Sequence, residues 1–127
     1  MEIVGIKLIK DDNYIKYIKP IKDINAMLSI GEIKKRILNN EYVIQFDLMG
    51  DVNEQILLGA DSYTLNLNFI NNLKNLESLG AKIEVYLNDE LVNKEKLMNK
   101  IEFLREIEQQ VEEDMEREAQ AEKNEEE

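Results

Sequence analysis

The sequence predicts an α+β protein whose elements follow the order strand, helix, helix, strand, helix, strand, helix. Two observations predict this class. In some segments apolar and polar residues alternate, as in a half-buried strand, and in others apolar residues recur with helical periodicity. The length of 127 residues suits one small domain. With 43% hydrophobic residues but only three Phe and five Tyr, the chain must build its core mostly from Ile and Leu.

The first strand is expected over residues 3–9, where apolar and β-branched residues predominate before the polar group at residues 10–13. Residues 14–24 then carry apolar side chains at helical spacing with lysines between them. Pro20 is tolerated in the first turn of a helix but not in its interior, so this helix is predicted to begin shortly before it.

A second helix is predicted from Ile30 to about Asn39. Ser29 is its expected N-cap, and Glu32 follows at the capping-box spacing. The next segment, residues 42–48, alternates apolar with polar residues and is predicted to be a strand with one buried face.

The following segment is less regular. Gly50–Asp51 indicates a turn, and the short apolar run at residues 55–58 is a candidate for the second arm of a hairpin. A third helix is expected to begin at Asp61 or Ser62. It should end at Gly80, a residue type suited to the left-handed conformation that follows many helices.

The last strand and the last helix complete the predicted order. Residues 81–87 alternate as a strand, which Asn88–Asp89 is expected to stop. Asn93 is the expected N-cap of an acidic C-terminal helix, so we divide the chain into a domain at residues 1–90 and a helix at 91–127. Beyond residue 115 no large apolar side chain remains, and fraying is expected. The apolar seam of this helix consists of Leu97, Ile101, Leu104, Ile107, Val111 and Met115.

The absence of Cys and His excludes several classes of function. The chain has no disulfide, thiolate nucleophile, imidazole base or zinc finger. Its five glycines form no phosphate-binding loop and no pair of carboxylates marks a concave site, so we expect no enzyme and no cofactor. The acidic residues 112–116 lack the alternating ligands and central glycine of a calcium loop, so no metal is expected.

No apolar run approaches the roughly 18 residues that a membrane span needs. The N-terminus also lacks the basic and then apolar layout of a secretion signal. We therefore expect a cytoplasmic protein with no membrane partner.

The formal net charge of −11 is distributed unevenly. Residues 7–36 contain eight basic and four acidic side chains, whereas residues 101–127 contain twelve carboxylates and three basic side chains. A phosphate-binding surface usually needs an excess of Lys and Arg over the whole domain, so direct binding of nucleic acid is not expected. The expected partner is another protein with a charged surface, and the acidic tail suits a basic one.

Residues 17–27 read Tyr-Ile-Lys-Pro-Ile-Lys-Asp-Ile-Asn-Ala-Met, residues 30–37 read Ile-Gly-Glu-Ile-Lys-Lys-Arg-Ile, and residues 73–85 read Leu-Lys-Asn-Leu-Glu-Ser-Leu-Gly-Ala-Lys-Ile-Glu-Val. These stretches resemble the C-terminal domain of the bacterial ribosomal stalk protein L-seven/L-twelve. The resemblance covers about residues 3–87. It implies a β-α-α-β-α-β sandwich of three helices on one antiparallel sheet, to which the acidic helix from Asn93 onward is an addition.

In the stalk family the first two helices form a partly basic surface that receives GTPase translation factors. The resemblance therefore implies a protein-binding surface at Lys19, Lys22 and Lys34, with Ile30 and Ile33 beside them. The alternative is an ordinary solvated helix face whose long basic side chains cover apolar surface.

The acidic C-terminal helix is the second candidate surface. Its apolar seam has to be covered by the domain, by a second copy of the chain or by a partner, unless the helix is only a solubilising tail. Glu108 interrupts the heptad pattern, which favours the domain or a partner over a long symmetric zipper. The candidate partner-binding residues on this helix are Ile101, Leu104, Glu108, Val111 and Glu112.

The sequence thus predicts a non-enzymatic protein-protein interaction module that binds through its basic helix pair or its acidic C-terminal helix. The alternative is an acidic inhibitor or immunity-type protein, which would mimic nucleic acid and block a basic active site such as that of a nuclease. Small size, a pI of about 4.5 and the lack of reactive groups suit both readings.

Overall fold

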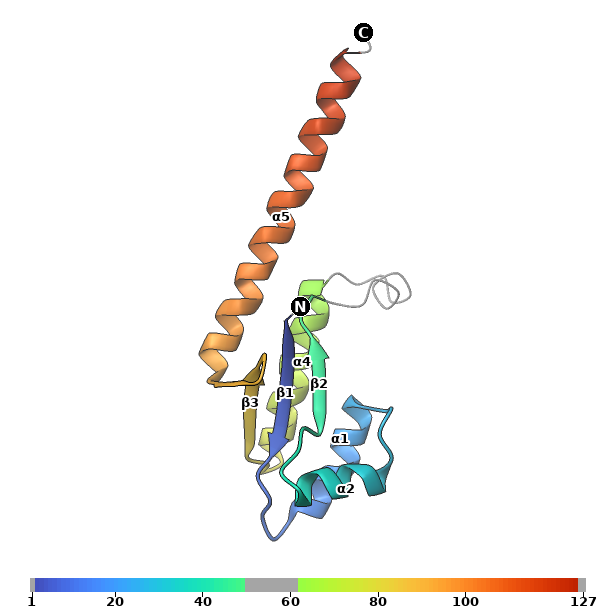
Figure 1. The fold of residues 1–127 in the computed structure, drawn as a ribbon, viewed down its shortest axis with the longest axis vertical. Coiled ribbons are helices and arrows are strands. Elements are labelled where there is room, and N and C mark those ends of the chain that lie inside the picture. The colour runs from blue at the N-terminus through green and yellow to red at the C-terminus, as the bar shows by residue number, and fades with distance from the viewer. Residues whose placement is uncertain (1, 50–61, 126–127) are drawn as a thin grey trace.

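The computed structural model describes residues 2–49 and 62–125, apart from the side chains of Glu112 and residues 120–125. The predicted α+β class is confirmed: the described residues form a four-stranded antiparallel sheet of order β2-β1-β3-β4 together with helices (Figure 1). The expected turn at Gly50–Asp51 and the apolar run at residues 55–58 lie outside the described residues.

The elements follow the predicted order, with one added strand. They are β1 (Ile3–Leu8), the 3-10 helix η1 (Tyr14–Tyr17), α1 (Ile18–Ile24), α2 (Ile30–Leu38), β2 (Ile44–Asp47), α4 (Ser62–Ser78), β3 (Ile83–Leu87), β4 (Glu90–Val92) and α5 (Lys94–Glu125). As the proline argument predicts, Pro20 lies in the first turn of α1.

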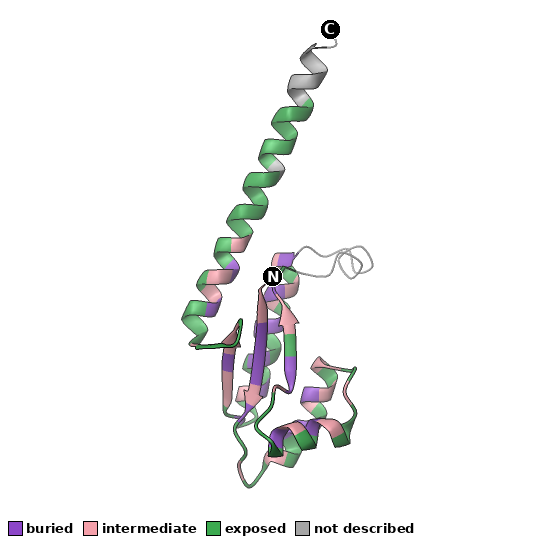
Figure 2. Ribbon diagram, viewed as in Figure 1, coloured by how far each residue is buried: buried purple, intermediate pink, exposed green. Residues whose placement is uncertain are grey.

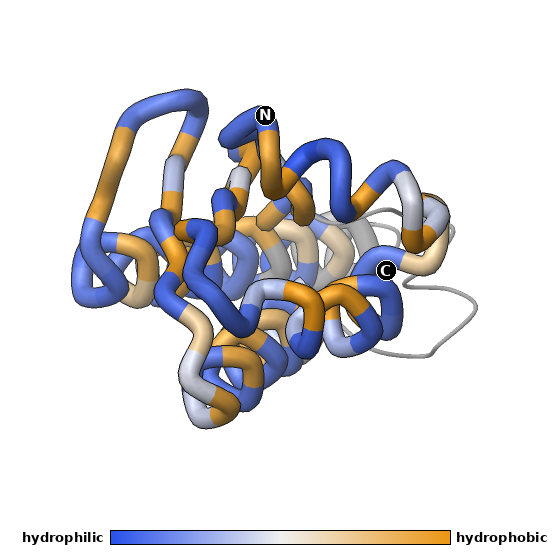
Figure 3. The backbone as a smooth tube through the Cα atoms, turned by 90° about the horizontal axis from the view of Figure 1, so that it is seen from below, coloured by the Kyte–Doolittle hydropathy of each residue, from blue (hydrophilic) through white to orange (hydrophobic). Residues whose placement is uncertain are grey.

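One face of the sheet supplies much of the core. Val4 and Ile6 of β1 are fully buried, and their cross-strand partners on β2, Phe46 and Ile44, face the same side. The ring of Phe46 stacks on Phe69 of α4 with centroids 4.4 Å apart. Figure 1 shows α4 running along the sheet behind the strands. In Figure 3, apolar and polar residues alternate in short stretches, as expected of elements that bury one face.

The predicted helix boundaries are marked by the side chains that the sequence indicates. Ser29 Oγ accepts a hydrogen bond of 3.1 Å from the backbone N–H of Glu32, and Asn93 Oδ1 accepts one of 2.7 Å from Lys96. Both caps satisfy N–H groups that have no partner within the first turn of a helix. After α4, Gly80 adopts φ of +102°, the left-handed conformation expected there.

The strand β4 is absent from the sequence-based prediction, which places a helix directly after β3. The two residues between β3 and β4, Asn88 and Asp89, have φ of 51° and 67°. Positive φ at both positions is the signature of a tight two-residue hairpin turn, for which Asn and Asp are suited. The Asn-Asp pair therefore reverses the chain instead of only ending the strand.

The first turns of helix α5 differ from the prediction. Leu97 and Ile101 are 0% exposed and belong to the core, so its first turns are part of the packed domain. The predicted domain boundary after residue 90 falls inside β4. At the other end the helix extends to Glu125. Figure 2 shows buried residues only near the start of α5, and Figure 1 shows the rest projecting away from the domain.

The outer face of the sheet has a close approach that requires glycine. A Cβ atom on Gly5 would lie 2.6 Å from Cε1 of Tyr42, whose ring covers this strand position. That ring is held by a hydrogen bond of 2.8 Å to Asp89 and by an edge contact with Tyr86, with centroids 5.5 Å apart. A larger residue at position 5 would have to displace it.

Replacing Gly5 by Ala should lower the free energy of unfolding by about 1–3 kcal/mol, because the added methyl group overpacks against the Tyr42 ring. Urea titration monitored by circular dichroism measures the change. The matched control is Gly31→Ala in α2, where a Cβ meets nothing within 4 Å. That change should raise stability by about 0.5–1 kcal/mol through helix propensity. Equal effects at the two glycines would contradict the assigned role of Gly5.

Candidate protein-binding surfaces

The exposed side of α2 and the turn before it form the first candidate surface, which we call the α2 face. Its apolar members are Met27, Ile30 and Leu38, which are 94%, 58% and 48% exposed. Ile30, Lys34 and Leu38 follow one another at four-residue intervals and so lie on one side of the helix. Neighbouring exposed apolar residues rimmed by polar side chains are typical of a protein-binding surface.

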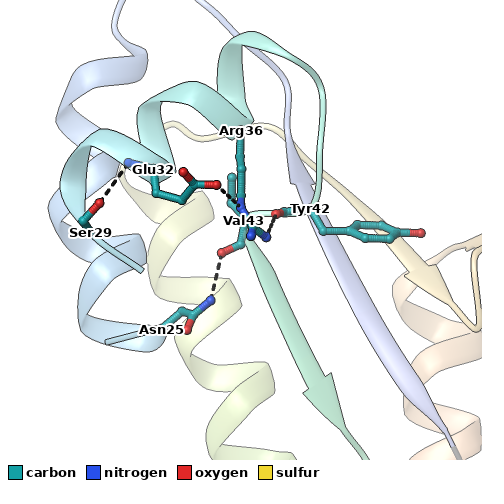
Figure 4. A network of polar contacts seen from close by, with 6 residues as sticks. All are labelled: Asn25, Ser29, Glu32, Arg36, Tyr42 and Val43. Carbon is teal, nitrogen blue, oxygen red and sulfur yellow. Dashed lines mark hydrogen bonds and ion pairs between the residues drawn. The ribbon is translucent and has the colours of Figure 1, made fainter. Parts of the chain in front are cut away.

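A network of polar contacts fixes α2 to the sheet (Figure 4). Arg36 donates to Glu32 over 3.2 Å and to the backbone carbonyl oxygen of Tyr42 over 3.1 Å. Asn25, at the end of α1, donates over 3.3 Å to the carbonyl oxygen of Val43. These contacts join both helices to the segment that leads into β2, so the α2 face is presented by a rigid support.

The structure separates the residues that the stalk resemblance groups together. Lys19, Ile30 and Lys34 are exposed. Lys22 is half-buried and donates to the carbonyl oxygens of Leu28 and Ala26 at 2.9 and 3.4 Å, so it closes the turn between α1 and α2. Ile33 is 0% exposed and lies in the core. The sequence-based prediction of Ile33 as a partner-binding residue is therefore corrected: its side chain packs α2 against the core and is not available to a partner.

The second candidate surface is the apolar stripe of the projecting part of α5, which we call the α5 stripe. It consists of Leu104, Ile107, Val111 and Met115. Leu104 is half-buried, and the other three are 46%, 48% and 66% exposed. The stripe continues the line of Leu97 and Ile101 outward from the core. Ile101 was predicted to bind a partner, but it is fully buried, so we reassign it to the core.

The charged residues around the α5 stripe are mostly acidic. Glu108, which interrupts the apolar pattern of the stripe, is exposed. Between residues 102 and 119 the helix has eight carboxylates and two arginines. Each arginine lies near a carboxylate of its own helix: Arg105 is 3.9 Å from Glu102, and Arg117 is 4.0 Å from Asp114. The side chain of Glu112, also a predicted contact, is outside the described part of the structure.

A small cavity of about 60 Å³ lies where the α5 stripe meets α4. Leu104, Ile107 and Glu108 of α5 and Tyr63 and Asn66 of α4 contribute to its lining. Asn66 is 2% exposed, and its side-chain amide donates to the carbonyl oxygen of Leu48. Among the described residues, its Oδ1 has no hydrogen-bond partner. A buried acceptor without a donor is costly, so this end of the stripe has an unmet requirement for a hydrogen-bond donor.

The outer face of the sheet is a third surface. Lys7 lies over the rings of Tyr42 and Tyr86, with Nζ 5.4 and 4.9 Å from their centroids. Burial, followed by the hydrogen bond to Asp89, raises the pKa of Tyr42 to about 12. The tyrosine hydroxyl is therefore protonated at neutral pH and acts as a donor, which is a structural role and gives no reactive group.

Ion pairs help to hold α5 on the domain. Lys100 lies 3.1 Å from Glu2, and Lys94 lies 2.6 Å from Glu77. Burial acts to raise the pKa of the Glu2 carboxyl, but hydrogen bonds from Lys100 and Asn88 outweigh it and lower that pKa below its ordinary value of 4.5. The Glu2–Lys100 pair thus fixes the first turns of α5 to the residue that precedes β1.

The described residues offer no constellation for metal binding: none of their acidic side chains gather in a group of three or more that could hold an ion. Within residues 2–49 and 62–125, no helix combines the length and the apolar character needed to cross a bilayer.

Comparisons of the chain with protein-family models, with curated proteins and with solved structures found no match. The fold and the surfaces therefore define the class of protein only as far as an α+β domain with a projecting acidic helix.

Some residues of these surfaces are missing from the sequence-based set. Met27 and Leu38 belong to the α2 face, and the four-residue spacing from Ile30 through Lys34 to Leu38 is the signal that could have indicated the latter. Phe103 is 52% exposed beside the α5 stripe. Leu38 and Phe103 lie off the predicted core stripes of their helices, so their exposure could be inferred once those stripes were known.

Replacing Glu2 by Gln should lower stability by about 1 kcal/mol at about pH 7, because the carboxylate paired with Lys100 is lost. A carboxyl whose pKa is lowered by folding contributes stability above its unfolded pKa, and this contribution disappears as the pH falls through the folded-state pKa. The variant and the parent should therefore become equally stable at low pH. Thermal unfolding across the acid range measures the difference; a difference that persists in acid contradicts the ion-pair role.

Replacing Ile101 by Ala should cost about 2–5 kcal/mol, since the side chain is fully buried between α5 and the domain. The matched control is Val111→Ala, ten residues further along the same helix, which should change stability by less than about 0.5 kcal/mol. Urea unfolding of both variants measures the two effects. Similar losses would mean that α5 packs on the domain beyond its first turns, contrary to the structure.

Proposed function

We propose that this chain is a non-enzymatic protein-binding module and that the α2 face is its docking surface. The observation that carries the proposal is the exposure of Met27, Ile30 and Leu38 beside exposed lysines on a helix held rigidly to the sheet. Rigid presentation favours binding because little conformational freedom is lost when the partner docks.

The partner is expected to be a protein surface with an apolar depression and a rim of carboxylates. Ile30 and Leu38 supply the apolar anchors, and Lys34, which lies between them on the same side of α2, supplies positive charge. Buried anchors give most of the affinity of such a contact, whereas the rim charges speed encounter and set orientation. The resemblance to the ribosomal stalk domain supports the same assignment, since it points to the same pair of helices.

A second candidate function, an acidic inhibitor of a basic site, is favoured by the projection of α5 and its excess of carboxylates. In this case α5 would enter the partner and the α2 face would remain free. The two functions predict different sensitive surfaces. A truncation to separate them should follow Glu106, because a cut after Lys100 would remove Ile101 from the core.

The test is quantitative affinity purification from the source cell with the folded full chain as bait. The variant combines Ile30→Gln, Lys34→Glu and Leu38→Gln, and the matched control is Lys74→Glu on the exposed side of α4. A partner of the α2 face should be recovered at least about tenfold less with the variant, as expected when buried anchors are lost. Recovery with the control and with the chain truncated after Glu106 should equal that of the parent.

The proposal fails if the triple variant, shown by circular dichroism to be folded, recovers every specific partner as well as the parent does. Loss of recovery with the truncated chain alone would transfer the function to α5 and favour the inhibitor. The three variants therefore distinguish the two functions in one measurement.

A further inference from the structure

We propose that the α5 stripe is the docking site for a basic amphipathic α-helix of another protein. The bound helix lies along α5 and forms a short two-helix coiled coil with it. This inference concerns a surface separate from the α2 face and does not depend on the function proposed for it.

The stripe continues the core-facing side of α5 beyond the domain. The same line of apolar residues that buries Leu97 and Ile101 completely continues through Leu104, Ile107, Val111 and Met115, where the domain no longer covers it. At 1.5 Å per residue, the part from Leu104 to Met115 extends over about 16 Å. This is three turns of helix with an apolar side chain at each step, a geometry that one facing helix covers and a flat surface does not.

Charge decides between the possible occupants. Glu108 lies within the seam, and Asp114 and Glu118 border it, while the segment as a whole has four times as many carboxylates as arginines. In a pairing with a second copy, Glu108 would enter an apolar seam already crowded with carboxylates, which is unfavourable at neutral pH. A helix with lysine or arginine beside its apolar stripe would instead pair with these carboxylates while it covers Val111 and Met115.

The cavity at the base of the stripe adds a second feature. The cavity is lined by Leu104, Ile107 and Glu108 of α5 itself. An incoming helix that follows the stripe therefore reaches the cavity. There, Asn66 Oδ1 is buried and lacks a donor, within the residues that the structure describes. The end of the incoming helix would therefore lie beside the cavity that Asn66 lines.

The test uses a defined probe, a synthetic peptide of three heptads with Leu at the two seam positions and Lys at the others. Its binding to the full chain is measured by fluorescence anisotropy at low and high salt. A scrambled peptide of the same composition, without an apolar face, is the peptide control. We expect the patterned peptide to bind at least about tenfold more tightly than the scrambled one, with weaker binding at high salt.

Two matched protein variants separate apolar docking from general attraction between opposite charges. Ile107→Gln with Val111→Gln removes the centre of the stripe and keeps every carboxylate. Glu106→Gln with Glu113→Gln removes two exposed charges from the opposite side of the helix and keeps the stripe. The first variant should weaken binding of the patterned peptide at least about tenfold, and the second by less than about threefold.

Three results would overturn the proposal. One is equal binding of the patterned and scrambled peptides, and another is a larger loss with the charge variant than with the stripe variant; both would indicate attraction without docking. The third is a dimer of the chain at micromolar concentration that the stripe variant abolishes in sedimentation equilibrium, which would make a second copy the occupant. Because all substituted positions are exposed, both variants should retain the circular dichroism and urea midpoint of the parent.

Discussion

The apolar face of the sheet must be covered on one side, and the rest of the structure depends on how that is achieved. Val4, Ile6 and Leu8 of β1 point to this side and are almost completely removed from solvent. The cover comes from α4 and the first turns of α5, while α1 and α2 add Ile21 and Ile33 at one end. Burial of these side chains is the main favourable term in folding, so it dictates which part of each helix remains accessible.

The two candidate surfaces are consequences of this cover. Helix α2 uses Ile33 and Ile37 in the core, so Ile30 and Leu38, which lie to the sides of that stripe, remain in solvent. Helix α5 is longer than the sheet that it covers, so Val111 on the same seam has no counterpart in the domain. One surface is therefore a side of a short anchored helix, and the other is the unsupported length of a long one.

The charges of the two surfaces are opposite in sign, and the structure keeps them apart. Figure 1 shows α2 at one end of the sheet and the projecting part of α5 leading away from the other end. An ion pair between Glu2 and Lys100, whose hydrogen bond helps to lower the pKa of the carboxyl, holds the first turns of α5 in this direction. The two candidate surfaces therefore differ both in position and in charge.

The sequence alone determined the class of fold, the element order and the caps at Ser29 and Asn93, because these depend on local periodicity and on hydrogen bonds within a few residues. It did not reveal β4, whose three residues are too few for a periodic signal and exist as a strand only by pairing with β3. Nor could it decide which apolar residues face a partner. Ile33 and Ile101 fit both a core and a docking stripe, and only tertiary packing, which covers one turn of a helix and leaves the next exposed, placed them inside.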